Sequence, residues 1–397
     1  MPTQRIIYTM AGHVSSLKQT RFQPGSASVI ATCSRDGSVQ IWDLRCKGFD
    51  APVQKLYSSL DGESASRLHT HNDLKYARST NTIFDAHASR QPLPAVPMAN
   101  PKLPSASSDA PSKTESPSRR GDVSITAISF LPGERSHLLL TASEANATVK
   151  LWDLRTTHNP RSGRRATPLS STRQPDSHTR HRHFGLTSLA LSTDGARLYT
   201  LCRDNTIYTY STPHLILGSA PELSLSASSS RPRRSGGGTE KQGLGPIYGF
   251  RHPKFHATTF YVKAAIRPTS GANTELLAVG SSDGCAVLFP TDERYMRRPP
   301  PSRSTSPPAK RNAPRLNDTI PIYTHGAALV RGHSREVTGL TWMPGGELVS
   351  VGDDFRARCW REDTQGARGL RVGGEGEGRR WGRGWAEVEG GWDEDED

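Results

Sequence analysis

The sequence is poor in apolar residues and lacks long hydrophobic runs. Only 34% of its 397 residues are hydrophobic, whereas 36 are glycine and 29 are proline. A chain that buried its whole length would need more apolar residues, so we expect a large share of it to be solvated linker. No stretch approaches the roughly 18 consecutive apolar residues that indicate a transmembrane helix. The N-terminal segment also lacks the charged-then-apolar plan of a signal peptide.

Closely spaced cysteines are missing as well. The five cysteines are an odd number and form no C-x-x-C motif: Cys33, Cys46, Cys202, Cys285 and Cys359. This spacing excludes a disulfide framework and a zinc knuckle, and it is typical of a reduced cytosolic or nuclear protein.

Motifs of common catalytic centres are absent from the sequence. It contains no P-loop, no G-x-S-x-G elbow and no H-E-x-x-H motif. The glycine-rich stretch 373–378 is acidic and precedes no helical pattern, so it cannot cradle a phosphate. His178, His181 and His183 resemble a metal cluster, but they lie among arginines without a cysteine or carboxylate to complete a tetrahedral set. We therefore predict no enzymatic activity, no metal and no cofactor.

Positive charge is concentrated in polar insertions. The net charge is +13, and four stretches rich in Pro, Ser, Gly and Arg hold 26 Lys/Arg against 13 Asp/Glu: 55–122, 156–182, 212–245 and 292–325. The remainder, including the acidic run 393–397, is close to neutral. The insertions have almost no aromatic side chains, whereas a nucleic-acid interface combines a basic folded face with aromatic platforms. We predict solvated insertions and no direct contact with nucleic acid.

One pattern recurs five times: a small or polar turn, an Asp or Asn, and an aromatic residue six positions later. The pairs are Asp36–Trp42, Asn146–Trp152, Asp204–Tyr210, Asp283–Phe289 and Asp354–Trp360. Two strand-like runs lie upstream of each pair, so three strands plus a fourth leading into the next unit describe one blade. Without the insertions each unit is about 40 residues long, which is the length of a WD-repeat blade. The sequence predicts an all-β WD-repeat β-propeller with five recognisable blades.

The repeat also assigns structural roles. The aspartate lies in a tight turn, where its carboxylate can accept a hydrogen bond from the histidine that begins the blade, and the aromatic ring packs between neighbouring blades. The residues predicted to be structural rather than catalytic are His13, Asp36, Trp42, Asn146, Trp152, Asp204, Tyr210, Asp283, Phe289, His333, Asp354 and Trp360. Asn146 stands where aspartate is usual, so we expect a weaker hydrogen bond in that blade.

The expected organisation is a propeller over 4–362, interrupted by the four insertions, and a disordered Gly/Arg/acidic tail over 363–397. Two serines in the insertions are possible phosphorylation sites. Ser116 begins a Ser-Pro-x-Arg motif favoured by cyclin-dependent kinases, and Ser306 precedes a proline. Phosphate beside arginines could order such a loop locally.

The order of local motifs carries more information than any one of them. IWDLRCKG (41–48) is followed by FDAH (84–87), VKLWDLR (149–155), TFYVKAAI (259–266) and GHSREVTGLTWMP (332–344). In that order the chain resembles the Denticleless family, WD-repeat substrate receptors of cullin-4 RING ubiquitin ligases. The resemblance covers about 4–362 apart from the insertions.

The resemblance implies a non-catalytic nuclear subunit that recruits replication and cell-cycle proteins for ubiquitination and proteasomal degradation, with substrates presented on the sliding clamp. It also implies that the two W-D-x-R motifs face the adaptor protein that links receptor to cullin: Asp43, Arg45, Asp153 and Arg155. Arginine suits this role because its planar fork binds carboxylate and carbonyl groups. The alternative function is a WD-repeat scaffold in RNA processing or chromatin.

The number of blades departs from the family. Its members have seven blades, whereas five are recognisable here. Either the chain lacks the first two blades, or residues 4–10 close a five-bladed ring by pairing with the blade that contains Trp360.

Overall fold

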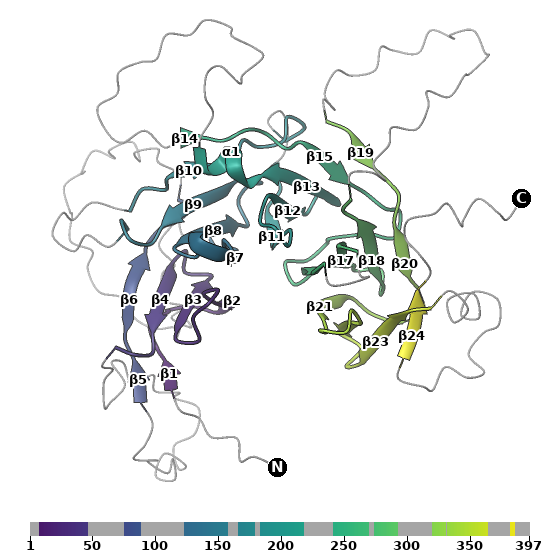
Figure 1. Ribbon diagram of the computed structural model, residues 1–397, viewed down its shortest axis with the longest axis horizontal. Helices are drawn as coiled ribbons and strands as arrows, with labels where there is room; N and C mark the ends of the chain where they lie inside the picture. The colour runs from purple at the N-terminus through teal and green to yellow at the C-terminus, as the bar shows by residue number, and fades with distance from the viewer. Residues whose placement is uncertain are drawn as a thin grey trace, which may run out of the picture.

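A computed structural model describes ten segments of the chain: 8–46, 75–88, 123–157, 166–178, 183–217, 241–269, 274–292, 320–330, 332–363 and 382–385. In this part, five sheets of four or five strands follow one another around an open arc (Figure 1). The prediction of an all-β WD-repeat propeller with five recognisable blades is confirmed. We number the sheets blades 1 to 5 in chain order.

Each blade is built from strands in chain order, the first of them innermost on the arc. Blade 1 contains β2 (Leu17–Phe22), β3 (Val29–Ser34), β4 (Val39–Asp43) and β6 (Ser79–Ile83). Blade 2 contains β7 (Ile125–Phe130), β8 (Leu138–Ser143), β9 (Val149–Asp153), β10 (Ser170–Ser171) and β14 (Lys241–Gln242). Blade 3 contains β11 (Leu186–Leu191), β12 (Arg197–Cys202), β13 (Thr206–Ser211), β15 (Tyr248–Phe250) and β19 (Ile322–Tyr323).

The remaining elements complete the arc. Blade 4 contains β16 (Ala264–Arg267), β17 (Leu276–Gly280), β18 (Ala286–Pro290) and β20 (Ala327–Leu329). Blade 5 contains β21 (Val337–Trp342), β22 (Leu348–Gly352), β23 (Ala357–Glu362) and β24 (Gly382–Trp385). Outside the blades lie β1 (Tyr8–Met10), β5 (Lys75–Ala77), a short 3₁₀ turn (Gly133–Arg135) and α1 (Thr212–Leu217). Among the described residues, no helix has the length and apolar character needed to cross a bilayer.

A tight turn between the second and third strands explains the repeated aspartate. In blade 1, Asp36 Oδ1 accepts a hydrogen bond from the backbone N–H of Ser38 at 2.9 Å, which fixes the turn. The residue after the aspartate is left-handed in four blades, with φ of 77° at Gly37, 62° at Asn205, 75° at Gly284 and 59° at Phe355. Glycine and asparagine tolerate this conformation, whereas phenylalanine does not adopt it readily.

Packing between blades buries the middle of the arc on both sheet faces. All six residues of β8 and all six of β13 are buried, because each of these strands is covered by a neighbouring blade on either side. At the two ends of the arc this cover is incomplete among the described residues, although β3 of blade 1 is still almost wholly buried. No residue of β2 is fully buried, and in β23 only Trp360 is.

The boundaries of the expected insertions need correction, because the blades draw their outer strands from them. Within 55–122, residues 75–88 contain β5 and β6, and within 156–182, residues 166–178 contain β10. Segments 212–217 and 241–245 contain α1 and β14, and 320–325 contains β19. Such short strands escape recognition because a fourth strand at a blade edge needs only backbone pairing and no apolar pattern.

Two expectations about the chain ends also change. Tyr8–Met10 pair in parallel with Lys75–Ala77, so of the two alternatives the one in which residues 4–10 pair with blade 5 was wrong. The tail expected to be disordered contributes β24, which pairs in parallel with β23 as the fourth strand of blade 5.

Candidate functional site

The two W-D-x-R motifs form the same turn on neighbouring blades. β4 ends at Asp43 and β9 ends at Asp153, and each carboxylate accepts a hydrogen bond from the backbone N–H two residues later, at 3.0 Å from Arg45 and 2.9 Å from Arg155. This local bond is the reason the chain turns at the end of the third strand.

Each turn also holds its arginine side chain in a bidentate ion pair. Arg45 donates through Nε and Nη2 to the two Asp43 oxygens at 2.9 and 2.7 Å. Arg155 donates to Asp153 in the same way at 3.0 and 2.9 Å. The side-chain bonds from the arginines hold the pKa of both aspartates below the usual range.

Exposure differs sharply within each pair. The Arg45 and Arg155 side chains are 70% and 65% exposed, whereas those of Asp43 and Asp153 are 20% and 9% exposed. The aspartate is therefore the anchor and the guanidinium is the presented group. Guanidinium donors not used in the ion pair can bind carboxylate or carbonyl groups of a partner.

Asn81 links the two blades at this end, and sequence reasoning missed it. Its side-chain amide donates to the Leu154 carbonyl at 3.2 Å and lies 2.6 Å from Thr157 Oγ1. Asn81 is on β6 of blade 1, whereas Leu154 and Thr157 flank Arg155 in blade 2. The β-branched residues in the stretch Ser79–Ile83, just before the FDAH motif, were the available signal for this strand.

At the opposite end of the blades, the residues predicted to be structural meet in hydrogen-bonded chains. In blade 1, His13 Nδ1 lies 3.1 Å from Asp36 Oδ2 and His13 Nε2 lies 2.8 Å from Thr32 Oγ1. The indole Nε1 of Trp42 donates to that hydroxyl at 2.8 Å. Although burial acts to raise it, bonds from His13 and Ser38 hold the pKa of Asp36 well below its usual range.

Blade 5 repeats this chain of contacts. His333 Nδ1 lies 3.0 Å from Asp354 Oδ1, and His333 Nε2 lies 2.8 Å from Ser350 Oγ. Trp360 Nε1 donates to the same hydroxyl at 2.8 Å.

In blade 2 the chain of contacts is incomplete. His87 Nε2 lies 2.8 Å from Thr141 Oγ1, and Trp152 donates to that hydroxyl at 2.9 Å. Asn146 Oδ1 accepts from the backbone N–H of Thr148 at 3.2 Å, which keeps the turn. The Nδ1 atom of His87 is buried without a hydrogen-bond partner in the described structure.

Blades 3 and 4 depart further from the pattern. His178 lies 2.6 Å from Asp204, and Tyr208 also donates to that carboxylate. Tyr210 occupies the tryptophan position, buried. In blade 4, His256 lies 3.1 Å from Asp283, and Phe289 fills the tryptophan position without a polar atom.

A possible metal site does not fit the residues present. His178, Cys202 and Asp204 bring ligand atoms within 4.8 Å of one another. However, these are only three donors, and His178 and Asp204 already bind each other at 2.6 Å. The bond between His178 and Asp204 corresponds to the histidine–aspartate contacts of blades 1 and 5, although His178 uses Nε2 where the other two histidines use Nδ1. Of the other two histidines of the expected cluster, His183 is exposed and His181 lies outside the described residues.

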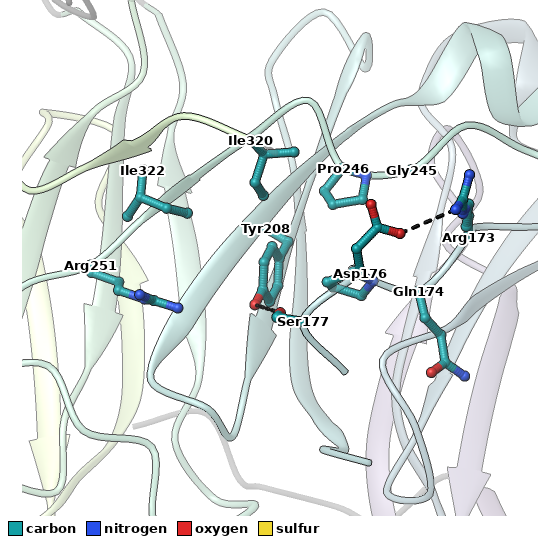
Figure 2. A pocket seen from close by; sticks show the side chains of 11 residues that line it. Arg173, Gln174, Asp176, Ser177, Tyr208, Gly245, Pro246, Arg251, Ile320 and Ile322 are labelled. Carbon is teal, nitrogen blue, oxygen red and sulfur yellow. Dashed lines mark hydrogen bonds and ion pairs between the residues drawn. The ribbon is translucent and has the colours of Figure 1, made fainter. Parts of the chain in front are cut away.

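A small cavity of about 100 Å³ lies beside blade 3 (Figure 2). Its lining includes Tyr208, Arg251, Ile320 and Ile322, and Figure 2 shows Arg173 paired with Asp176 at one side. This volume is smaller than that of ordinary ligand pockets, and no nucleophile or general base is paired within it. Ser116 and Ser306 lie outside the described residues.

Comparisons with known proteins agree with this architecture. The family model described as "WD domain, G-beta repeat" matches residues 4–43 and 326–361. The chain is 27% identical to the cell division cycle protein cdt2 of Schizosaccharomyces pombe over 89% of its own length and 50% of that protein. It is 24% identical to the human Denticleless protein homolog and 23% identical to the Drosophila melanogaster protein lethal(2)denticleless, over 90% of this chain in both cases and 35% and 34% of those proteins.

The chain thus spans half or less of the length of these relatives. The identity is modest, at 23–27%, over about nine-tenths of the chain. The resemblance of this WD-repeat propeller to the Denticleless and Cdt2 proteins, expected from its motifs, is confirmed across about nine-tenths of the chain.

Proposed function

We propose that this protein is the substrate-recognition subunit of a cullin-4 RING E3 ubiquitin ligase and performs no catalysis itself. The observation that carries the proposal is the pair of W-D-x-R turns, which present two guanidinium groups in one geometry on neighbouring blades. Similarity to proteins named Cdt2 and Denticleless supports it.

In this proposal the adaptor binds the C-terminal ends of β4 and β9. Asp43 and Asp153 hold Arg45 and Arg155 in place through bidentate bonds, so little side-chain entropy is lost when the adaptor binds them. Asn81 fixes the distance between the two turns, because it belongs to one blade and binds the other. Two preorganised cations on one edge suit carbonyl or carboxylate groups of a folded protein.

The same proposal assigns the cellular role. The protein acts in the nucleus and recruits replication and cell-cycle proteins, presented on the sliding clamp, for ubiquitination and proteasomal degradation. It needs no cofactor, and its partners are proteins rather than nucleic acid or membrane.

Co-purification tests the proposal. The double variant Arg45→Ala/Arg155→Ala is compared with Arg35→Ala/Arg335→Ala, which removes two exposed cations at the other end of the blades. We expect only the first variant to lose adaptor and cullin-4, with affinity reduced at least about tenfold, while both unfold at the wild-type temperature. Wild-type recovery of the adaptor with Arg45→Ala/Arg155→Ala would overturn the proposal.

A further inference from the structure

A group of cations and aromatic rings gathers on the inner side of the arc, at the end of the blades opposite the W-D-x-R turns. We call it the inner cluster: Lys18, Arg203, Phe260, Tyr261 and Lys263. Lys18 lies on β2, Arg203 follows β12, and the other three precede β16, so blades 1, 3 and 4 contribute. Lys18 follows Leu17, which pairs with Ser34 beside the Asp36 turn. β4 runs from that turn to Asp43, so the W-D-x-R turn lies at the opposite end of the blade.

The segment that carries the aromatic rings is irregular but firmly packed. Residues 251–263 contain no strand, yet Phe255, Ala257 and Val262 are almost completely buried. Glu336 accepts hydrogen bonds from the hydroxyls of Thr259 and Ser282, both at 2.8 Å, which ties the segment to blades 4 and 5. The rings beside these anchors therefore have a fixed position.

Each ring is paired with a cation. The Arg203 guanidinium carbon lies 4.6 Å from the centroid of Phe260, and Lys18 Nζ lies 5.6 Å from that of Tyr261. Lys263 Nζ donates to the carbonyls of Thr187 at 2.9 Å and Phe260 at 3.2 Å. An ammonium has three donors, so one N–H of Lys263 is left for a ligand.

The positive charge of the cluster is not balanced by acidic groups. Within the described part of the chain, no carboxylate forms an ion pair with Lys18, Arg203 or Lys263. The pKa of Lys263 is lowered to about 8, mainly by burial, and the nearby charges of Arg21 and Lys18 contribute to this lowering. An anion placed there would relieve this repulsion.

We propose that the inner cluster binds an acidic side chain of an extended peptide segment in a protein partner. Arg203, Lys18 and the third N–H of Lys263 supply charge-assisted donors for a carboxylate or phosphate group. The side chain of Tyr261 is exposed to solvent. In the proposed complex it packs against the peptide backbone next to the bound carboxylate or phosphate. If the protein is a ligase receptor, this partner is a substrate, and that identification alone depends on the proposed function.

A peptide fits the cluster better than a nucleic acid does. Single-stranded nucleic acids bind by stacking bases on open aromatic faces along a basic groove. Here a cation already lies over a face of both Phe260 and Tyr261, so that face is not open to a base.

Fluorescence anisotropy with the purified protein tests the proposal. The probe is a short labelled peptide of alternating glutamate and serine, and the neutral reference replaces glutamate with glutamine. Lys18→Gln/Arg203→Gln should weaken binding of the acidic peptide at least about tenfold. Arg135→Gln/Arg173→Gln, which removes the same charge from exposed sites outside the cluster, should retain binding within about twofold, and Lys18→Arg should bind like wild type.

Three results would overturn the proposal. The first is no difference between the acidic and the neutral peptide. The second is equal weakening in both double variants, which would indicate only long-range attraction. The third is preferential binding of a labelled oligothymidine. Adaptor co-purification with Lys18→Gln/Arg203→Gln should remain normal, so loss of peptide binding and loss of the ligase role are distinguishable.

Discussion

The Nε2 atom of His87 lies 2.8 Å from the Thr141 hydroxyl, which also accepts the indole N–H of Trp152. A single hydroxyl thus joins the loop that begins blade 2 to the aromatic residue that closes its third strand. The equivalent hydroxyls are Thr32 in blade 1 and Ser350 in blade 5. Only blade 2 of these three lacks the carboxylate that would satisfy the other ring nitrogen of its histidine.

Asn146→Asp should stabilise the protein. The substitution supplies a carboxylate to the buried Nδ1 atom of His87, as Asp36 does for His13, so we expect a gain of about 1 kcal/mol in the free energy of unfolding at neutral pH. Urea denaturation measures it. The matched control is Asp36→Asn, which should cost a similar amount, and a loss of stability in Asn146→Asp would contradict the argument.

Stability should fall below neutral pH because of His87. Burial lowers its pKa to about 3, with Lys150 adding to the effect, whereas an unfolded histidine titrates near 6.5. Between these values the unfolded chain binds a proton that the folded chain does not, so the free energy of unfolding decreases by up to about 1.4 kcal/mol per pH unit as the pH falls.

A second loss of stability should begin at lower pH, where unfolded aspartates are protonated. The hydrogen-bonded Asp36 and Asp204 have lowered pKa values, so their contribution is present above about pH 4 and disappears below it. Denaturation curves of wild type and His87→Gln, measured from neutral to acidic pH, give the free energy of unfolding at each pH and separate the effect of His87 from that of the two aspartates. A variant with the same slope as wild type between pH 6.5 and 4 would exclude His87 as the cause.

Thr141→Val should destabilise strongly. It has nearly the same shape but leaves the Trp152 indole N–H buried without a partner and His87 Nε2 with only the backbone carbonyl of residue 141 at 3.2 Å, at a total cost of about 2–4 kcal/mol. Thr141→Ser keeps the hydroxyl, as Ser350 does in blade 5, and should cost less than about 1.5 kcal/mol. Thermal unfolding compares the two. Equal loss in both variants would contradict the argument, because Thr141→Ser keeps the hydroxyl that Thr141→Val removes.

The blades could be predicted because the turn and the closing aromatic lie within one continuous stretch of chain. Asp36 and Trp42 are separated only by the third strand, and this local spacing survives in every blade. The histidines were found only where they stand close to the first strand, as His13 and His333 do. His87 and His178 belong to the same position but lie within the expected insertions, because the loop between fourth and first strands varies freely in length at the surface.

At the candidate adaptor site, too, some residues could be predicted from the sequence and others could not. The sequence motif was sufficient to select Arg45 and Arg155, since the Asp-x-Arg spacing is that of a local turn. It could not select Asn81, whose partners in blade 2 are more than seventy residues away in the chain. The inner cluster could not be predicted from the sequence either, because its cations come from three blades and only the fold brings them together.

Phe355→Asn should stabilise blade 5. Phe355 has a φ of 59° and a side chain that is 99% exposed, so it bears the strain of the left-handed region with almost no burial to offset it. Asparagine holds this position in blade 3, and we expect a gain of about 1 kcal/mol, seen as a higher melting temperature. Phe355→Ala is the control, since it removes the ring but retains Cβ. A gain as large in Phe355→Ala would mean that solvent exposure of the ring, rather than backbone strain, is responsible.

Asn81→Ala should weaken adaptor binding without removing a charge. The variant loses the bonds to the Leu154 carbonyl and Thr157 that fix the blade 2 turn relative to blade 1. Arg45 and Arg155 would keep their own aspartates, but their relative position would be less defined, so binding that needs both arginines should fall several-fold. Titration with purified adaptor measures this loss, and Thr82→Ala on the same strand is the control. The loss should be absent in an Arg155→Ala background, because a single remaining arginine cannot sense the relative position of two. Persistence of the full effect in that background would show that Asn81 acts through folding rather than by positioning Arg155.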